Sequence, residues 1–173
     1  MSTTVLGIDP GVSETGWAVL SADAGAVPHL VDSGLIKTLP SQPLPERLCL
    51  IHGAVARLME RFRPQAVAIE EMFFLKAAHT IRGTLQARGV ILLAAAQAGC
   101  AISEYNPRTV KATLTGSGAA DKRQMQRLVS KTLGLAELLR PDDVADAAAI
   151  ALCHLRTGRL KRLQVLELYG GGR

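Results

Sequence analysis

Aromatic residues are scarce in this chain of 173 residues, at 3% of the sequence. A protein that holds nucleic acid on a broad base-stacking platform needs several exposed aromatic rings. The composition therefore argues against this kind of binder. It leaves recognition of nucleic-acid shape and backbone open.

Cysteine is also sparse, and its placement excludes two classes of site. The three cysteines, Cys49, Cys100 and Cys153, lie far apart and form no Cys-x-x-Cys pair. An odd number at such spacing argues against a disulfide framework and against a cysteine-rich zinc site. We expect a reducing environment for the chain, which favours the cytoplasm.

Long apolar runs are missing as well. No segment reaches about 20 apolar residues without a charge, and the first residues lack a basic segment followed by an apolar one. We therefore expect no membrane partner. The length and the 48% of hydrophobic residues predict one ordinary globular domain.

The net charge of +5 is unevenly distributed along the chain. Residues 1–75 carry a net charge of −3, residues 76–131 carry +7 and residues 132–173 carry +1. Any single cation of the central stretch is best explained as part of a solvated helix face. Nine cations in 56 residues nevertheless favour a surface that binds anions.

Apolar periodicity and turn residues predict the order of strands and helices. Strands are predicted at residues 4–8, 15–20, 30–37, 66–70 and 101–105. Helices are predicted at residues 46–63, 76–98, 121–133 and 141–155, with a short helix from 107. The first three strands predict an antiparallel meander, and the later strands alternate with helices. The chain is thus predicted to be a mixed α/β layer fold, with a partly flexible tail at residues 158–173.

Four carboxylates occupy unusual positions in this pattern. Asp9 and Glu70 each end an apolar strand, and the carboxyl ends of strands are where α/β folds place ligands. Asp143 and Asp146 are three residues apart, so on a helix they share one face. Each also has a purely structural interpretation, such as an Asp-Pro-Gly turn for Asp9 or helix capping for Asp142 and Asp143.

Taken together, the four acids indicate a metal site. Several like charges at close range are tolerable only with cations among them. Oxygen ligands without paired Cys or His select a hard ion, Mg²⁺ or Mn²⁺. Two such ions about 4 Å apart are a known device for hydrolysing phosphodiesters, and the +7 stretch would supply the phosphate-binding face.

Several motifs along the chain resemble the RuvC family of bacterial Holliday junction resolvases. They are Gly-Ile-Asp-Pro-Gly at 7–11, Ala-Ile-Glu-Glu at 68–71, Gln-Ala-Arg-Gly at 86–89, Glu-Tyr-Asn-Pro-Arg-Thr-Val-Lys at 104–111, Gly-Ser-Gly-Ala-Ala-Asp-Lys at 116–122 and Asp-Val-Ala-Asp-Ala at 143–147. They follow in order from residue 5 to about residue 155. The resemblance implies one ribonuclease-H-like nuclease domain over residues 1–157 and a homodimer that cuts four-way DNA junctions with paired symmetric nicks. It also implies a branch-migration motor complex as a partner, and a role in recombination and DNA repair.

The resemblance also implies roles for individual residues. Asp9, Glu70, Asp143 and Asp146 correspond to the catalytic acids that bind two Mg²⁺ ions, for which Mn²⁺ can substitute. The residues expected to bind DNA are Phe73, Lys111 and Lys122, which match family positions, and Lys76 and Arg82, which belong to the +7 stretch. Phe73 corresponds to an aromatic residue that stacks on an unpaired base, although burial in the core is its alternative explanation.

Two positions depart from the family pattern or extend it. Leu85 stands where the family commonly has glycine, which would change how the long helix approaches its dimer mate. Glu71 adds a carboxylate beside Glu70, so a supporting role near the metal site is open.

Two other functions remain open from the residues alone. The chain could be a junction-binding module without catalysis, in which the acids are structural. Asp9, Gly11 and Gly16 also resemble the phosphate loop of actin-like ATPases and sugar kinases, but those proteins need two lobes and 173 residues are too few for both.

Overall fold

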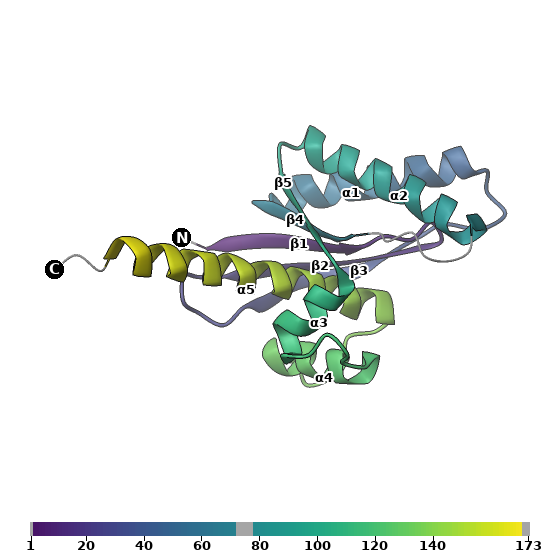
Figure 1. The fold of residues 1–173 in the computed structure, drawn as a ribbon. Helices are drawn as coiled ribbons and strands as arrows, with labels where there is room; N and C mark the ends of the chain where they lie inside the picture. Colours follow the sequence, from purple (N-terminus) through teal and green to yellow (C-terminus); the bar gives the residue numbers. More distant parts are fainter. Residues whose placement is uncertain (1, 72–77, 171–173) are drawn as a thin grey trace.

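A mixed five-stranded sheet forms the centre of the molecule (Figure 1). The structure is a computed structural model that describes the backbone of residues 2–71 and 78–170, and the side chains of residues 2–71 and 82–158. The strands are β1 (Thr3–Asp9), β2 (Glu14–Ala22), β3 (His29–Lys37), β4 (Ala66–Glu70) and β5 (Ala101–Tyr105), in the order β3-β2-β1-β4-β5. β1, β2 and β3 form the antiparallel meander, and β4 and β5 run parallel to β1. This confirms the predicted mixed sheet.

Helices cover both faces of the sheet and enclose two separate cores. The helices α1 (Leu44–Phe62) and α2 (Ala78–Gln97) lie on one face. The other face is covered by α3 (Pro107–Thr115), α4 (Lys122–Thr132) and α5 (Asp142–Gly170). Successive residues of β1 enter different cores, because side chains alternate between the faces of a strand. Val5 packs with α5, whereas Leu6 and Ile8 pack with α1 and α2.

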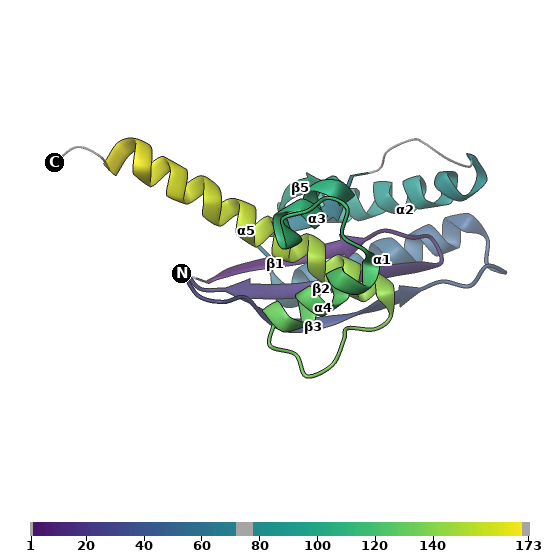
Figure 2. The same ribbon diagram turned by 60° about the horizontal axis from the view of Figure 1, so that its bottom comes forward.

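The predicted elements match the observed ones to within one or two residues, except at the end of α5. This helix continues to Gly170, 15 residues beyond the predicted end near residue 155. Residues 159–169 are mostly Leu, Arg, Lys, Gln and Glu, which favour helix and contain no proline. Gly158 costs the helix only about 1 kcal/mol and does not end it. The distal part of α5 extends past the sheet in both views (Figures 1 and 2).

Two glycines let α5 lie directly on the sheet. A Cβ at Gly7 of β1 would come 2.1 Å from the Ala147 carbonyl oxygen, and a Cβ at Gly16 of β2 would come 2.0 Å from the Asp143 carbonyl oxygen. Real Cβ atoms do not approach backbone this closely, so only glycine fits at either position. Gly16 pairs with Asp9 across β1 and β2, so this contact brings the start of α5 beside the end of β1.

The Gly16 contact yields a first prediction. We expect Gly16→Ala to lower the free energy of unfolding by roughly 3 kcal/mol, because α5 must move off the sheet. Gly53→Ala in α1 is the control, since its new Cβ would meet only the flexible end of Arg57 at 3.6 Å. The control is expected to stabilise the protein by up to about 1 kcal/mol. Urea denaturation measures both, and equal effects would contradict the close contact.

Candidate active site

Two of the predicted acids sit side by side at the carboxyl ends of parallel strands. Ile8 of β1 pairs with Ile69 of β4, and Asp9 and Glu70 follow at the next position of each strand. Successive side chains of a strand point to opposite faces of the sheet. Ile8 and Ile69 therefore enter the core beneath α1 and α2, whereas Asp9 and Glu70 face α5. The sheet therefore places two partly buried carboxylates next to each other.

The other two acids come from the first turns of α5. Asp142 and Asp143 lie in the first turn, where the helix dipole favours acids, and Asp146 follows one turn later. Asp143 and Asp146 are partly buried, and both act electrostatically on Asp9. The structure thus gathers all four predicted acids, Asp9, Glu70, Asp143 and Asp146, at one end of the sheet.

Burial and mutual repulsion make these carboxylates hard to ionise. Burial, followed by the charges of Glu70, Asp146 and Asp143, raises the pKa of Asp9 to about 7. Burial and the charge of Asp146 raise the pKa of Glu70. Burial also raises the pKa of Asp146, although Lys122 opposes this change. Such a group of acids gains free energy by binding a cation or protons.

Lys122 supplies one positive charge at this cluster. Its Nζ lies 3.0 Å from Oδ2 of Asp142 and 3.6 Å from Oδ2 of Asp146. Asp142 also accepts a hydrogen bond of 2.7 Å from Nε2 of Gln126. These contacts lower the pKa of Asp142 and raise that of Lys122. Lys122 at the start of α4 is thereby held against the first turns of α5.

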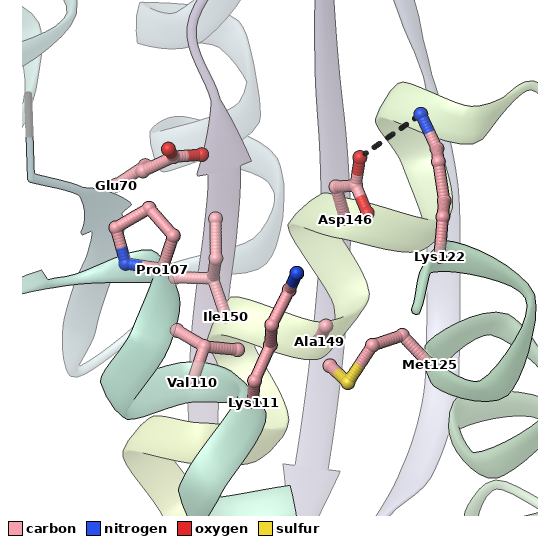
Figure 3. A pocket seen from close by; sticks show the side chains of 9 residues that line it. All are labelled: Glu70, Pro107, Val110, Lys111, Lys122, Met125, Asp146, Ala149 and Ile150. Carbon is pink, nitrogen blue, oxygen red and sulfur yellow. Dashed lines mark ion pairs between the residues drawn. The ribbon is translucent and has the colours of Figure 1, made fainter. Parts of the chain in front are cut away.

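A cavity of about 250 Å³ opens beside the acids and connects them with two lysines (Figure 3). Glu70 and Asp146 lie on opposite sides of it, and Lys111 of α3 points into the space between them. The remaining wall is mostly apolar and comes from α3, α4 and α5. Its residues are Pro107, Val110, Met125, Ala149 and Ile150.

Of the three other predicted DNA-binding residues, one lies in the described part of the chain. Arg82 is exposed on α2, away from the lining of the cavity. Phe73 and Lys76 lie outside the described residues. Two further positions singled out in the sequence are also described. Leu85 is partly buried on α2. The backbone N–H of Glu71 donates a hydrogen bond of 2.9 Å to the Tyr105 carbonyl oxygen.

Sequence reasoning missed the contact of Asp142 with Lys122 and the apolar wall of the cavity. The sequence predicts only a capping role for Asp142. The sequence does indicate that the two residues that contact Asp142 share a helix face, because Lys122 and Gln126 are four residues apart. Nothing in the sequence indicated that this face would meet the start of α5.

The donor set fits a hard divalent cation. In the side chains that the structure describes, no three Asp, Glu, His or Cys residues are already close enough together to hold an ion. However, the carboxylates of Asp9 and Glu70 accept no hydrogen bond from any described residue, and burial followed by the charge of neighbouring carboxylates raises their pKa values. Oxygen donors of this kind are the ligands that Mg²⁺ and Mn²⁺ prefer.

The part of the chain that carries these acids and lysines matches a known protein family. A family model described as crossover junction endodeoxyribonuclease RuvC matches residues 5–154. Proteins of that name from Chloroflexus aggregans and Endomicrobium trichonymphae are 50% and 46% identical over 152 and 153 residues. Each match covers 88% of this chain, with 92% and 80% of the respective relative.

Solved structures agree with this similarity. The structure of Thermus thermophilus RuvC matches with a TM-score of 0.85 and 38% identity, covering 93% of this chain and 97% of its own. The structure of T. thermophilus RuvC in complex with Holliday junction substrate matches with a TM-score of 0.83 and 36% identity, covering 92% and 96%. The yeast mitochondrial Holliday junction resolvase Ydc2 shares the fold at 14% identity, with a TM-score of 0.70 and coverage of 92% and 81%. None of the described helices has the length and apolar character needed to cross a membrane.

The raised pKa of Asp9 predicts how pH affects stability without metal. A carboxyl whose folded pKa lies near 7 instead of 3.8 destabilises the fold increasingly as pH rises between these values. We expect Asp9→Asn to raise the free energy of unfolding by roughly 2–4 kcal/mol at pH 8 in chelator, with a smaller gain at pH 5. Asp23→Asn, at an exposed loop residue, should have little effect at either pH. Thermal denaturation tests this, and a gain independent of pH would contradict it.

Proposed function

Since the chain belongs to the RuvC family of crossover junction endodeoxyribonucleases, we propose that it resolves four-way (Holliday) DNA junctions by paired symmetric nicks. The family includes a T. thermophilus protein whose structure was determined with Holliday junction substrate. The proposed reaction hydrolyses phosphodiester bonds during recombination and DNA repair. Its products are 5′ phosphate and 3′ hydroxyl ends, which a ligase can seal.

The observation that carries this proposal is the convergence of four carboxylates beside a cavity with two lysines. Asp9 is the proposed central ligand, because it acts electrostatically with Glu70, Asp143 and Asp146 together. Lys111 and Lys122 line the cavity, where ammonium groups can bind the DNA backbone. Hydrolysis of nucleic acid by metal ions requires carboxylates that bind the ions and cationic groups that bind the phosphate, and this site has both.

Each residue then has a defined role in the mechanism. Asp9, Glu70, Asp143 and Asp146 would hold two Mg²⁺ ions, with Mn²⁺ as a substitute. When bound, divalent ions lower the pKa of an attacking water and stabilise charge on the leaving 3′ oxygen. Lys111 and Lys122, which line the cavity, would orient the scissile phosphate. Lys122 contacts Oδ2 of Asp146 at 3.6 Å, so Oδ1 of that carboxylate could serve as the ligand.

The assembly is part of the proposal. A four-way junction has two-fold symmetry, so a homodimer presents two equivalent sites to two like strands. We also propose that three residues shortly after Glu70 in the sequence bind DNA near the crossover. They are Phe73, Lys76 and Arg82. A branch-migration motor is the proposed protein partner, as the family resemblance implies.

The metal-binding acids are tested through Asp146. We expect Asp146→Asn to bind a synthetic four-way junction within about threefold of wild type while losing cleavage in Mg²⁺ by at least about 1,000-fold, because a ligand is lost without losing the phosphate contacts. Gel-shift assays in chelator and cleavage assays in Mg²⁺ measure the two effects. A linear duplex is the substrate control and should stay uncut. Wild-type protein that binds junctions but never cuts them would favour the non-catalytic module instead.

The basic wall of the cavity is tested through Lys122. We expect Lys122→Ala to reduce turnover about 10- to 100-fold, and to lower the slope of log Kd against log salt by about one ion, because one phosphate contact is lost. Lys131→Ala, at the other end of α4, is the matched control and should change neither quantity. Junction binding from about 50 to 200 mM salt supplies the measurement. An unchanged slope for Lys122→Ala would place its ammonium group away from phosphate.

A further inference from the structure

Arg88 of α2 joins three elements at the edge of the candidate site. Its Nη2 forms an ion pair with Oε2 of Glu104 on β5, and its Nε donates a long hydrogen bond of 3.4 Å to the carbonyl oxygen of Glu70. The Arg88 side chain is only 15% exposed, whereas that of Glu104 is 47% exposed. The guanidinium therefore reaches from the helix to the last residue of β4 and to its neighbouring strand.

Strand alternation explains why Arg88 contacts Glu70 only through the backbone. Glu104 pairs with Ile69, and both face α1 and α2. Glu70 pairs with Tyr105, and these two side chains face α5, where the Tyr105 hydroxyl lies 2.9 Å from Nδ1 of His154. Arg88 thus contacts β4 from the face opposite the acids. It touches the main chain of Glu70 and leaves its carboxylate free.

The same helix contacts the end of β1. A Cβ at Gly83 of α2 would come 3.0 Å from Cγ1 of Val12, in the turn that follows Asp9. One helix therefore packs behind both strands that end in a catalytic acid. Of these two contacts, Arg88 makes the polar and directional one.

We propose that Arg88 is a positioning residue for Glu70, and that its ion pair with Glu104 sets the direction in which Glu70 presents its carboxylate. The inference rests on the proposed nuclease function. The Glu70 carboxylate accepts no hydrogen bond from any described residue, so its direction depends on the backbone that carries it. β5 is an edge strand, and Arg88 fastens it to α2 beside the last residue of β4.

The inference predicts an effect on metal binding and turnover that exceeds any effect on folding or on DNA binding. Residues that orient metal ligands typically change metal affinity or activity by 10- to 100-fold when they are replaced. A merely structural ion pair would instead change the melting temperature and leave the metal response unchanged. Arg61 provides the matched comparison, because it forms an ion pair of 3.1 Å with Asp32 between α1 and β3, away from the acids.

The experiment compares full-length wild type with Arg88→Gln, Arg88→Lys, Glu104→Gln and Arg61→Gln. Four quantities are measured: the melting temperature in chelator, the Kd for a four-way junction in chelator, the cleavage rate as a function of Mg²⁺ concentration, and Mn²⁺ binding without DNA by electron paramagnetic resonance. We expect Arg88→Gln to cleave 10- to 100-fold more slowly, and its Mg²⁺ midpoint and Mn²⁺ Kd to rise at least threefold. Its junction Kd should stay within twofold of wild type. Glu104→Gln and Arg88→Lys should show intermediate losses, and Arg61→Gln should match wild type.

Each contrary result has a definite meaning. If Arg88→Gln keeps wild-type cleavage and metal midpoints, or if Arg61→Gln changes them equally, Arg88 has no positioning role. If Arg88→Gln does not fold, Arg88→Lys and Glu104→Gln decide the matter, and normal metal binding in both overturns the inference. Loss of folding in all three variants also overturns it, because the role is then structural. Wild-type protein without junction cleavage contradicts the proposed function itself.

Discussion

The close contact of α5 with β1 and β2 is the constraint on which the rest of this structure depends. Glycine at positions 7 and 16 allows the helix backbone to lie against the sheet. This approach carries Asp143 and Asp146 to the ends of the strands that bear Asp9 and Glu70. Any larger side chain at either glycine would separate the two halves of the site. The acids converge because of packing, and in spite of their mutual repulsion.

Electrostatic strain is the counterpart of that packing. Burial and like charges raise the pKa values of Asp9, Glu70 and Asp146, so the free energy gained by folding is partly spent on holding them together. Lys122 relieves a part of this strain through Asp146. The repulsion among the carboxylates that Lys122 does not offset favours the binding of cations. Affinity for metal and cost to stability therefore have the same origin.

Much of the fold and the four acids could be predicted from the sequence, because the signals are local. An apolar run that stops at a carboxylate identifies the ends of β1 and β4, and Asp143 with Asp146 shows a helical spacing. The helix α5 extends beyond its predicted end because helix-favouring neighbours outweigh Gly158. Contacts such as Asp142 with Lys122, or Arg88 with Glu104, join segments that only tertiary packing brings together. No local pattern indicates them.

The continuity of α5 has a consequence for how this chain tolerates change in length. A residue inserted between Asp146 and Cys153 would rotate everything on one side of it by about 100° relative to the other. Either the acids would then turn away from the site or the buried alanines would turn away from the sheet, and no intermediate rotation keeps both orientations. The distal part of the helix extends past the sheet, so an insertion there leaves the orientation of the acids unchanged (Figure 2). One uninterrupted helix thus contains an indel-intolerant segment and an indel-tolerant one.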